Sequence, residues 1–119
     1  MRAIATETEI SEALNCFISK LVKAIKVEAI ILFGSYINGS PDEWSDFDVA
    51  VISPDFNGMG MPERQSLLAR LGLGCDTRIS PIGYPSSEYH NPGRHSFLRE
   101  IIRTGRVVWQ AETNQPSMS

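Results

Sequence analysis

The sequence predicts an α+β fold in which helices pack on a small mixed β-sheet. Three patterns support this fold class: apolar residues recur at helical spacing over 9–25, and two β-rich apolar runs occupy 27–33 and 46–52. The composition does not change along the 119 residues, so we expect one domain, 1–119, that is large enough to bury its own core. Residues 110–119 are expected to form a frayed tail.

The first helix is expected over residues 9–25, with Thr8 as a plausible N-cap. Its apolar stripe consists of Ile10, Leu14, Phe17, Ile18, Leu21, Val22 and Ile25. The two strands that follow are both largely apolar, so helices must cover at least one face of the sheet. The first helix is the nearest candidate for that cover.

The second half of the chain alternates between turn-forming and regular segments. A loop rich in Gly and Pro is expected over 53–62, followed by a helix over 62–70. Residues 75–82 alternate in polarity and predict a third strand, which Pro81 restricts to an edge or an end. A last helix is expected to start at Asn91 and Pro92, to bury Phe97, Leu98, Ile101 and Ile102, and to end at Gly105.

Charge and cysteine content exclude several classes of protein. The net charge of -3 and the lack of a Lys/Arg-rich block argue against stable nucleic-acid binding. No apolar run reaches membrane length, and the acidic N-terminal segment does not resemble a signal peptide. Cys16 and Cys75 have no metal-ligand spacing, so we expect reduced thiols in a cytoplasmic protein.

The segment from residue 32 to residue 53 carries the chemistry. Residues two apart in a strand share a face, so Asp46 and Asp48 are expected to place two carboxylates within a few ångströms of each other. Such a pair repels unless a cation lies between its members, and oxygen ligands of this kind suit Mg²⁺. Gly34 allows close approach of the backbone to a ligand, and the turn at Ser35 can hold phosphate. Taken singly, a Gly-Ser pair or a D-x-D is usually an ordinary turn.

The combination resembles a known family. Gly34, Ser35, ten intervening residues and then Asp46-Phe47-Asp48 match the G-S-x10-D-x-D pattern of the minimal nucleotidyltransferases, in the DNA polymerase β-like superfamily. The apolar strand before, Gly39, Ser45, and the closing helix and strand in "FLREIIRTGRVVW" extend the resemblance over most of the chain. It implies a palm-like fold of the polymerase β type, in which Gly-Ser holds a nucleoside triphosphate.

The resemblance further implies two Mg²⁺ ions held by Asp46, Asp48 and a third carboxylate on a neighbouring strand. Asp76, which opens the expected third strand, is the candidate, although a turn aspartate is the alternative. Ser80 stands on the same face where some relatives carry an acidic residue, and Asn38 stands where many carry an arginine. Arg78 is left out of the site because an ion pair explains it as well as a phosphate contact does.

The sequence therefore favours a nucleotidyltransferase that transfers NMP, most simply AMP from ATP, to a hydroxyl group and releases pyrophosphate. A chain of this size has little surface for choosing an acceptor, so a partner protein, a second copy or a separate helical domain should supply it. Resemblance implies a small helical toxin of the HEPN type, with this chain as antitoxin. The rival is a binding module that keeps the fold and neutralises or scaffolds a helical partner by contact alone.

Overall fold

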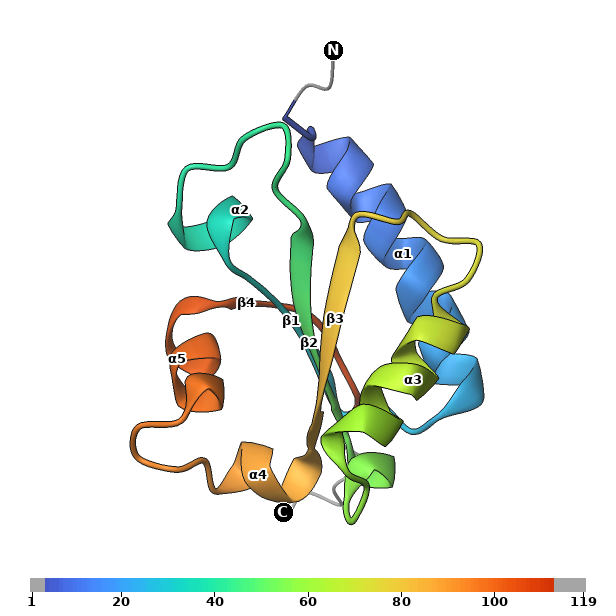
Figure 1. Cartoon of the computed structure of the whole chain (residues 1–119), viewed down its shortest axis with the longest axis vertical. Helices are drawn as coiled ribbons and strands as arrows, with labels where there is room; N and C mark the ends of the chain where they lie inside the picture. The colour runs from blue at the N-terminus through green and yellow to red at the C-terminus, as the bar shows by residue number, and fades with distance from the viewer. Residues whose placement is uncertain (1–3, 113–119) are drawn as a thin grey trace.

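The computed structural model describes residues 4–112. The elements follow in the order α1 (Glu7–Ala24), β1 (Ala29–Phe33), α2 (Ser35–Asn38), β2 (Phe47–Ser53), the 3-10 helix η1 (Pro54–Phe56), α3 (Met61–Leu71), β3 (Ile79–Pro85), α4 (Ser86–His90), α5 (Phe97–Thr104) and β4 (Arg106–Gln110). Figure 1 shows the strands in the middle of the molecule, with helices on either side.

The four strands form one mixed sheet in the order β3-β2-β1-β4. β1 is antiparallel to β2 and to β4, whereas β2 and β3 are parallel. The prediction of a small mixed sheet is therefore confirmed. β3 is an edge strand, where a proline that cannot donate a ladder hydrogen bond is tolerated, and it carries Pro81 as expected.

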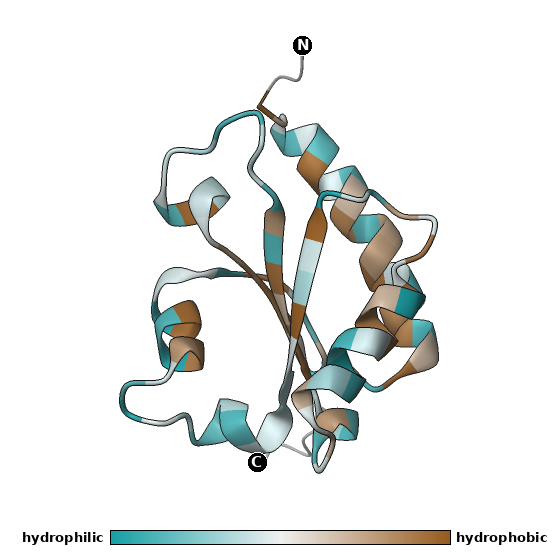
Figure 2. Ribbon diagram, in the orientation of Figure 1, coloured by the Kyte–Doolittle hydropathy of each residue, from teal (hydrophilic) through white to brown (hydrophobic). Residues whose placement is uncertain are grey.

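Helices cover both faces of the sheet. Phe17 and Leu21 of α1 and Leu68 of α3 pack with Phe47 and Val49 of β2 in the larger core. The alternate strand residues face the other way, where Ala50, Ile52 and Ile31 pack with Leu98 and Ile101 of α5. Figure 1 shows α1 and α3 on one side of the strands and α4 and α5 on the other. Hydrophobic and hydrophilic residues alternate around α1, as expected for a helix that buries one side (Figure 2).

The first helix begins slightly earlier than predicted. Thr6, not Thr8, is the N-cap, because its side chain accepts a hydrogen bond from the Glu9 amide at 3.1 Å. The Glu9 carboxylate in return accepts from the Thr6 amide at 2.9 Å. This reciprocal capping box satisfies two amide groups that the first turn leaves without helical partners, and it fixes the start of α1.

The predicted last helix is shorter than expected and is preceded by another short helix. Residues 86–90 form α4, which the sequence did not predict, and α5 begins at Phe97 instead of at Asn91. The hydroxyl of Ser96 accepts a hydrogen bond from the Arg99 amide at 3.1 Å, so this residue is the actual N-cap. The helix ends at Gly105, as predicted.

Two further expectations are corrected. Cys16 and Cys75 form a disulfide with 5.9 Å between their Cα atoms, so the expectation of reduced thiols is wrong. The bond ties α1 to the loop before β3. Gln110 pairs with Ala29 as part of β4 and does not belong to a tail, while residues 113–119 lie outside the described part of the chain. Among residues 4–112, no helix is long and apolar enough to cross a membrane.

Candidate functional site

The Gly-Ser turn and the aspartate pair meet at one end of the sheet. Because β1 and β2 are antiparallel, the last residue of β1, Phe33, lies opposite Asp48 near the start of β2. Gly34 follows Phe33 directly, and a Cβ atom built on it would collide with Oδ2 of Asp48. The Asp48 carboxylate therefore lies against the backbone of the glycine turn, as the sequence predicted.

Gly34 has a backbone conformation that other residues rarely adopt. Its φ is 87° and its ψ is −153°, and its carbonyl accepts the amides of Ile37 and Asn38 at 3.0 and 2.9 Å as the four-residue helix α2 begins. A positive φ and the contact with Asp48 both require the absence of a side chain. This explains why a glycine stands here, independently of any ligand.

The two carboxylates interact electrostatically. Asp46 is exposed just before β2, whereas Asp48 is partly buried within it. Burial raises the pKa of Asp48, and the negative charge of Asp46 raises it further. The charged form of Asp48 is thus disfavoured in the protein alone, and a cation that neutralised the pair would relieve this cost.

A pocket of about 340 Å³ opens over this end of the sheet. Asp48 lies beside Gly34 and Asn38 on one side of it, and α5 forms another side. The α5 residues that line it include Glu100 and Thr104. Sequence reasoning missed Glu100, although residues 97, 100, 101 and 104 share one helix face and all line the pocket.

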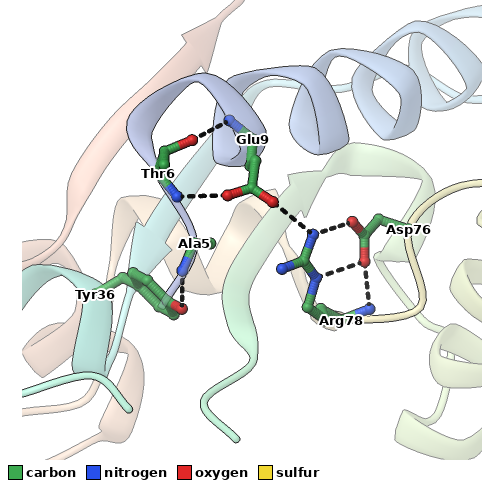
Figure 3. Close-up of polar contacts among 6 residues, drawn as sticks. All are labelled: Ala5, Thr6, Glu9, Tyr36, Asp76 and Arg78. Carbon is green, nitrogen blue, oxygen red and sulfur yellow. Dashed lines mark hydrogen bonds and ion pairs between the residues drawn. The ribbon is translucent and has the colours of Figure 1, made fainter. Parts of the chain in front are cut away.

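The structure does not bring Asp76 to the aspartate pair. The third strand begins at Ile79 and not at residue 75, so Asp76 lies in the preceding loop. Its carboxylate accepts hydrogen bonds from Nη2 and Nε of Arg78 at 2.7 and 3.0 Å and from the Arg78 amide at 2.9 Å. Figure 3 shows Asp76 and Arg78 turned toward each other, with Glu9 of α1 beyond them.

This ion-pair network lies on the other side of the sheet from Asp48. The Arg78 guanidinium lies 4.8 Å from the ring centroid of Phe47, a residue that faces the core under α1. Because neighbouring residues in a strand point to opposite faces, Asp48 is directed away from Arg78 and Asp76. Among residues 4–112 there is no group of three His, Cys, Asp or Glu side chains placed to hold a metal ion. The predicted three-carboxylate site is not assembled.

The strand position beside Asp48 is occupied by Ser80. The two residues are directly paired in the parallel ladder between β2 and β3 and so share a face of the sheet. A hydroxyl group thus stands where a carboxylate would have completed the set. The arrangement that remains, a glycine turn against one of two interacting carboxylates, suits a divalent cation together with a phosphate-bearing ligand. Sites for phosphoryl and nucleotidyl transfer combine groups of these kinds.

Comparison with known proteins agrees with this class. The nucleotidyltransferase domain family matches residues 14–76, more than half of the chain, and that range includes the Gly-Ser turn and both aspartates. MJ0141 of Methanocaldococcus jannaschii is named as a protein adenylyltransferase. It is 38% identical to this chain over 86 residues, and the match covers 70% of this chain and 80% of MJ0141. MJ0604 from the same organism, also named as a protein adenylyltransferase, is 32% identical over 104 residues. That match covers 87% of this chain and 97% of MJ0604. The chain belongs to the nucleotidyltransferase family.

Two solved structures share its fold. A Sulfolobus solfataricus protein described as a nucleotidyltransferase superimposes with a TM-score of 0.60 at 13% identity, covering 89% of this chain and 90% of its own. A toxin-antitoxin structure with AMP-PNP contains a chain that superimposes with a TM-score of 0.50 at 25% identity, covering 82% of this chain and 73% of its own. The predicted fold class is confirmed.

Proposed function

We propose that the protein is a Mg²⁺-dependent nucleotidyltransferase that transfers AMP from ATP to a hydroxyl group of an acceptor protein. The observation that carries this proposal is the contact between Gly34 and the Asp48 carboxylate, with Asp46 close enough to raise the pKa of Asp48. A phosphate bound at the glycine turn would then be in contact with a cation bound at the carboxylates. Nucleotidyl transfer requires this contact because the cation neutralises charge on the phosphates.

The donor set fits a magnesium ion. Asp46 and Asp48 offer oxygen ligands only, and Mg²⁺ is commonly held by one or two carboxylates, with water and substrate phosphate completing its coordination. The raised pKa of Asp48 indicates a carboxylate that lacks a compensating charge in the protein alone. When bound, the ion would neutralise charge on the phosphates and favour ionisation of the acceptor hydroxyl.

The residues of the chain would position the reacting groups. The Asp48 carboxylate lies against Gly34, so a phosphate bound by the Ser35 hydroxyl and the Ser35 and Tyr36 amides would lie close to that carboxylate. The acceptor oxygen forms a bond to the α-phosphorus, while the bond from that phosphorus to the bridging oxygen breaks. Pyrophosphate leaves with the electron pair, and the hydroxyl proton passes to solvent.

The identity of nucleotide and acceptor rests on the relatives. Both M. jannaschii proteins are named as protein adenylyltransferases, which favours AMP as the group transferred and a protein as the acceptor. The toxin-antitoxin structure contains AMP-PNP, an ATP analogue. We extend this to a small helical toxin of the HEPN type as the natural acceptor and to this chain as its antitoxin.

A second function has one specific observation in its favour. Ser80 pairs with Asp48 where a third carboxylate would lie, and Asp76 is held elsewhere by Arg78. A site with only two carboxylates could belong to a domain that neutralises its helical partner by contact alone. The persistence of the close Asp46 and Asp48 pair argues against this, because two uncompensated carboxylates are unfavourable.

One assay separates the two functions. The protein is incubated with Mg²⁺ and ATP labelled at the α-phosphate, with and without a helical protein encoded beside it. We expect label on the acceptor with the wild type and a loss of about 100-fold or more with Asp46→Asn or Asp48→Asn. Asp76→Asn, which removes a carboxylate of the same kind on the other side of the sheet, should retain transfer.

The outcomes are distinct. Absence of label under every condition would refute the enzyme, and inhibition of the toxin by the unlabelled complex would then support the contact-only antitoxin. If Asp76→Asn lost transfer as severely as Asp48→Asn, Asp76 would have to be the third metal ligand. The ion pair between Asp76 and Arg78 would then have to open when the ligands bind.

A further inference from the structure

A second concavity adjoins the pocket that holds Asp48. It encloses about 710 Å³ between the loop preceding α5 and the outer surface of that helix. We call it the α5 concavity; its lining includes Arg94, His95, Phe97, Arg99, Ile102 and Arg103. Phe97 and Glu100 line both this concavity and the pocket over Asp48, so the two hollows meet at the first turn of α5.

The α5 concavity is positively charged in a protein whose net charge is -3. Within residues 4–112, the side chains of Arg94 and Arg99 make no ion pair, so their charges face solvent. Arg103 is different, because Nη2 and Nε donate to the Glu100 carboxylate at 2.7 and 3.3 Å. Arg99 and Arg103 are four residues apart and therefore lie on the same side of α5.

The concavity also exposes apolar surface. Phe97 is 58% exposed and Ile102 is 38% exposed, although both belong to a helix whose neighbours Leu98 and Ile101 are buried. Phe97 is held at its inner edge by Phe33, with the ring centroids 5.7 Å apart. Arginine and aromatic side chains are the residues most enriched at the centres of protein interfaces.

We propose that the α5 concavity is the docking site of the acceptor protein, which it binds through an acidic segment next to the hydroxyl group to be modified. The proposal rests on the proposed function and adds the side from which the acceptor arrives. Repulsion by the acidic remainder of the surface and attraction by Arg94 and Arg99 would orient an acidic segment here. From this position a neighbouring hydroxyl reaches the pocket at Asp48 past Phe97.

An acidic protein segment fits better than a nucleic acid. Two unpaired arginines in one hollow neutralise few phosphates, whereas tight nucleic-acid binding needs many such contacts on a basic surface. The exposed Phe97 and Ile102 add apolar contacts that suit a folded or helical protein partner.

The test is a binding measurement that contains neither ATP nor Mg²⁺, so its result does not depend on nucleotidyl transfer. The probe is a fluorescent peptide with one tyrosine among glutamates, titrated with the full chain at low salt and followed by anisotropy. Arg94→Glu/Arg99→Glu should weaken binding at least about tenfold. Lys23→Glu/Arg70→Glu makes the same change of net charge at exposed positions of α1 and α3, and should weaken it less than about threefold.

Three results would overturn the proposal. The first is equal weakening by the two double variants, which would mean that only net charge matters. The second is tighter binding of a single-stranded oligoribonucleotide than of the peptide, again dependent on Arg94 and Arg99. The third is unchanged peptide binding in Arg94→Glu/Arg99→Glu with weakened AMP-PNP binding, which would assign these arginines to the nucleotide. Circular dichroism of each variant verifies that its helices are retained.

Discussion

At the scale of single residues, the candidate site depends on one contact between backbone and side chain. The Asp48 carboxylate occupies the space that a side chain at residue 34 would need. Gly34 also has a positive φ of 87°, so two separate physical reasons require glycine there. Gly58 serves as a control because only one of these reasons applies to it. Its φ is 83°, but a Cβ atom built on it would meet no atom within 4 Å.

Gly34→Ala should therefore be more damaging than Gly58→Ala. The Gly58 variant carries only the cost of the left-handed backbone, about 1–2 kcal/mol. The Gly34 variant adds displacement of Asp48, so we expect a loss in unfolding free energy of about 2–4 kcal/mol together with loss of nucleotidyl transfer. Urea denaturation of both variants measures the difference.

A double-mutant cycle identifies the cause. In an Asp48→Ala background the collision is removed, so the additional cost of Gly34→Ala over Gly58→Ala should decrease; what remains is the backbone cost of φ 87° and ψ −153° at residue 34. If the additional cost persisted, the backbone of the turn and not the carboxylate contact would be responsible.

The residues that the sequence located correctly are those whose relation is local. Gly34, Asp46 and Asp48 could be placed because the period of a strand and one strand-turn-strand excursion determine where they meet. Asp76 could not be placed correctly, because β3 starts only at Ile79, which leaves Asp76 in the preceding loop with its carboxylate bound by Arg78. Glu100 could not either, since its place over Asp48 depends on how α5 packs on the sheet.

At the scale of elements, the disulfide is the largest departure from expectation. It joins α1 to the loop that leads into β3, and the two cysteines are 59 residues apart in the sequence. Spacing alone gave no metal motif and no reason to pair them, because their proximity arises only when α1 packs beside the loop after α3. The same loop carries Asp76 and Arg78, so the disulfide and the Glu9–Arg78 contact hold α1 at neighbouring places.

Loss of this bond should lower stability without changing the fold. A disulfide that closes a loop of this length restricts the unfolded chain, and we expect Cys16→Ser/Cys75→Ser to lose about 2–4 kcal/mol in urea denaturation. Reduction of the wild type with dithiothreitol should cause a similar loss and have no effect on the double variant. Thiol titration of the native wild type should find no reactive cysteine; two reactive thiols in the native protein would contradict the bond.

Helices and strands with strong local signals were predicted well, and those with weak signals were not. β1 and β2 are largely apolar runs, and their predicted positions differ from the structure by one or two residues. The structure begins β3 later than predicted because its register with β2 starts at Ile79, after the turn that Asp76 and Arg78 form. The Pro92 start signal was overridden because the Ser96 hydroxyl caps α5 four residues later.

At the scale of the whole molecule, the two faces of the sheet have different roles. α1 and α3 lie on one side of the strands and α4 and α5 on the other (Figure 1). A pocket remains open beside α5 at Asp48. The buried face accounts for the fold, and the partly open face carries the pocket at Asp48 and the α5 concavity. Both hollows thus lie along α5, so the two proposals together would place this helix against both the nucleotide and the acceptor.

Because Mg²⁺ and nucleotide would bind the pocket of the folded protein and not the unfolded chain, together they should stabilise the folded state. A ligand at 100 times its dissociation constant adds about 2.7 kcal/mol to the free energy of unfolding, which for a chain of this size raises Tm by about 10 °C. We expect this rise with AMP-PNP and Mg²⁺ in differential scanning fluorimetry, and little change with AMP-PNP and EDTA. Asp46→Asn/Asp48→Asn should abolish it, while Asp76→Asn should retain it. An equal rise in the absence of Mg²⁺ would show that the aspartate pair is not where the nucleotide and the ion meet.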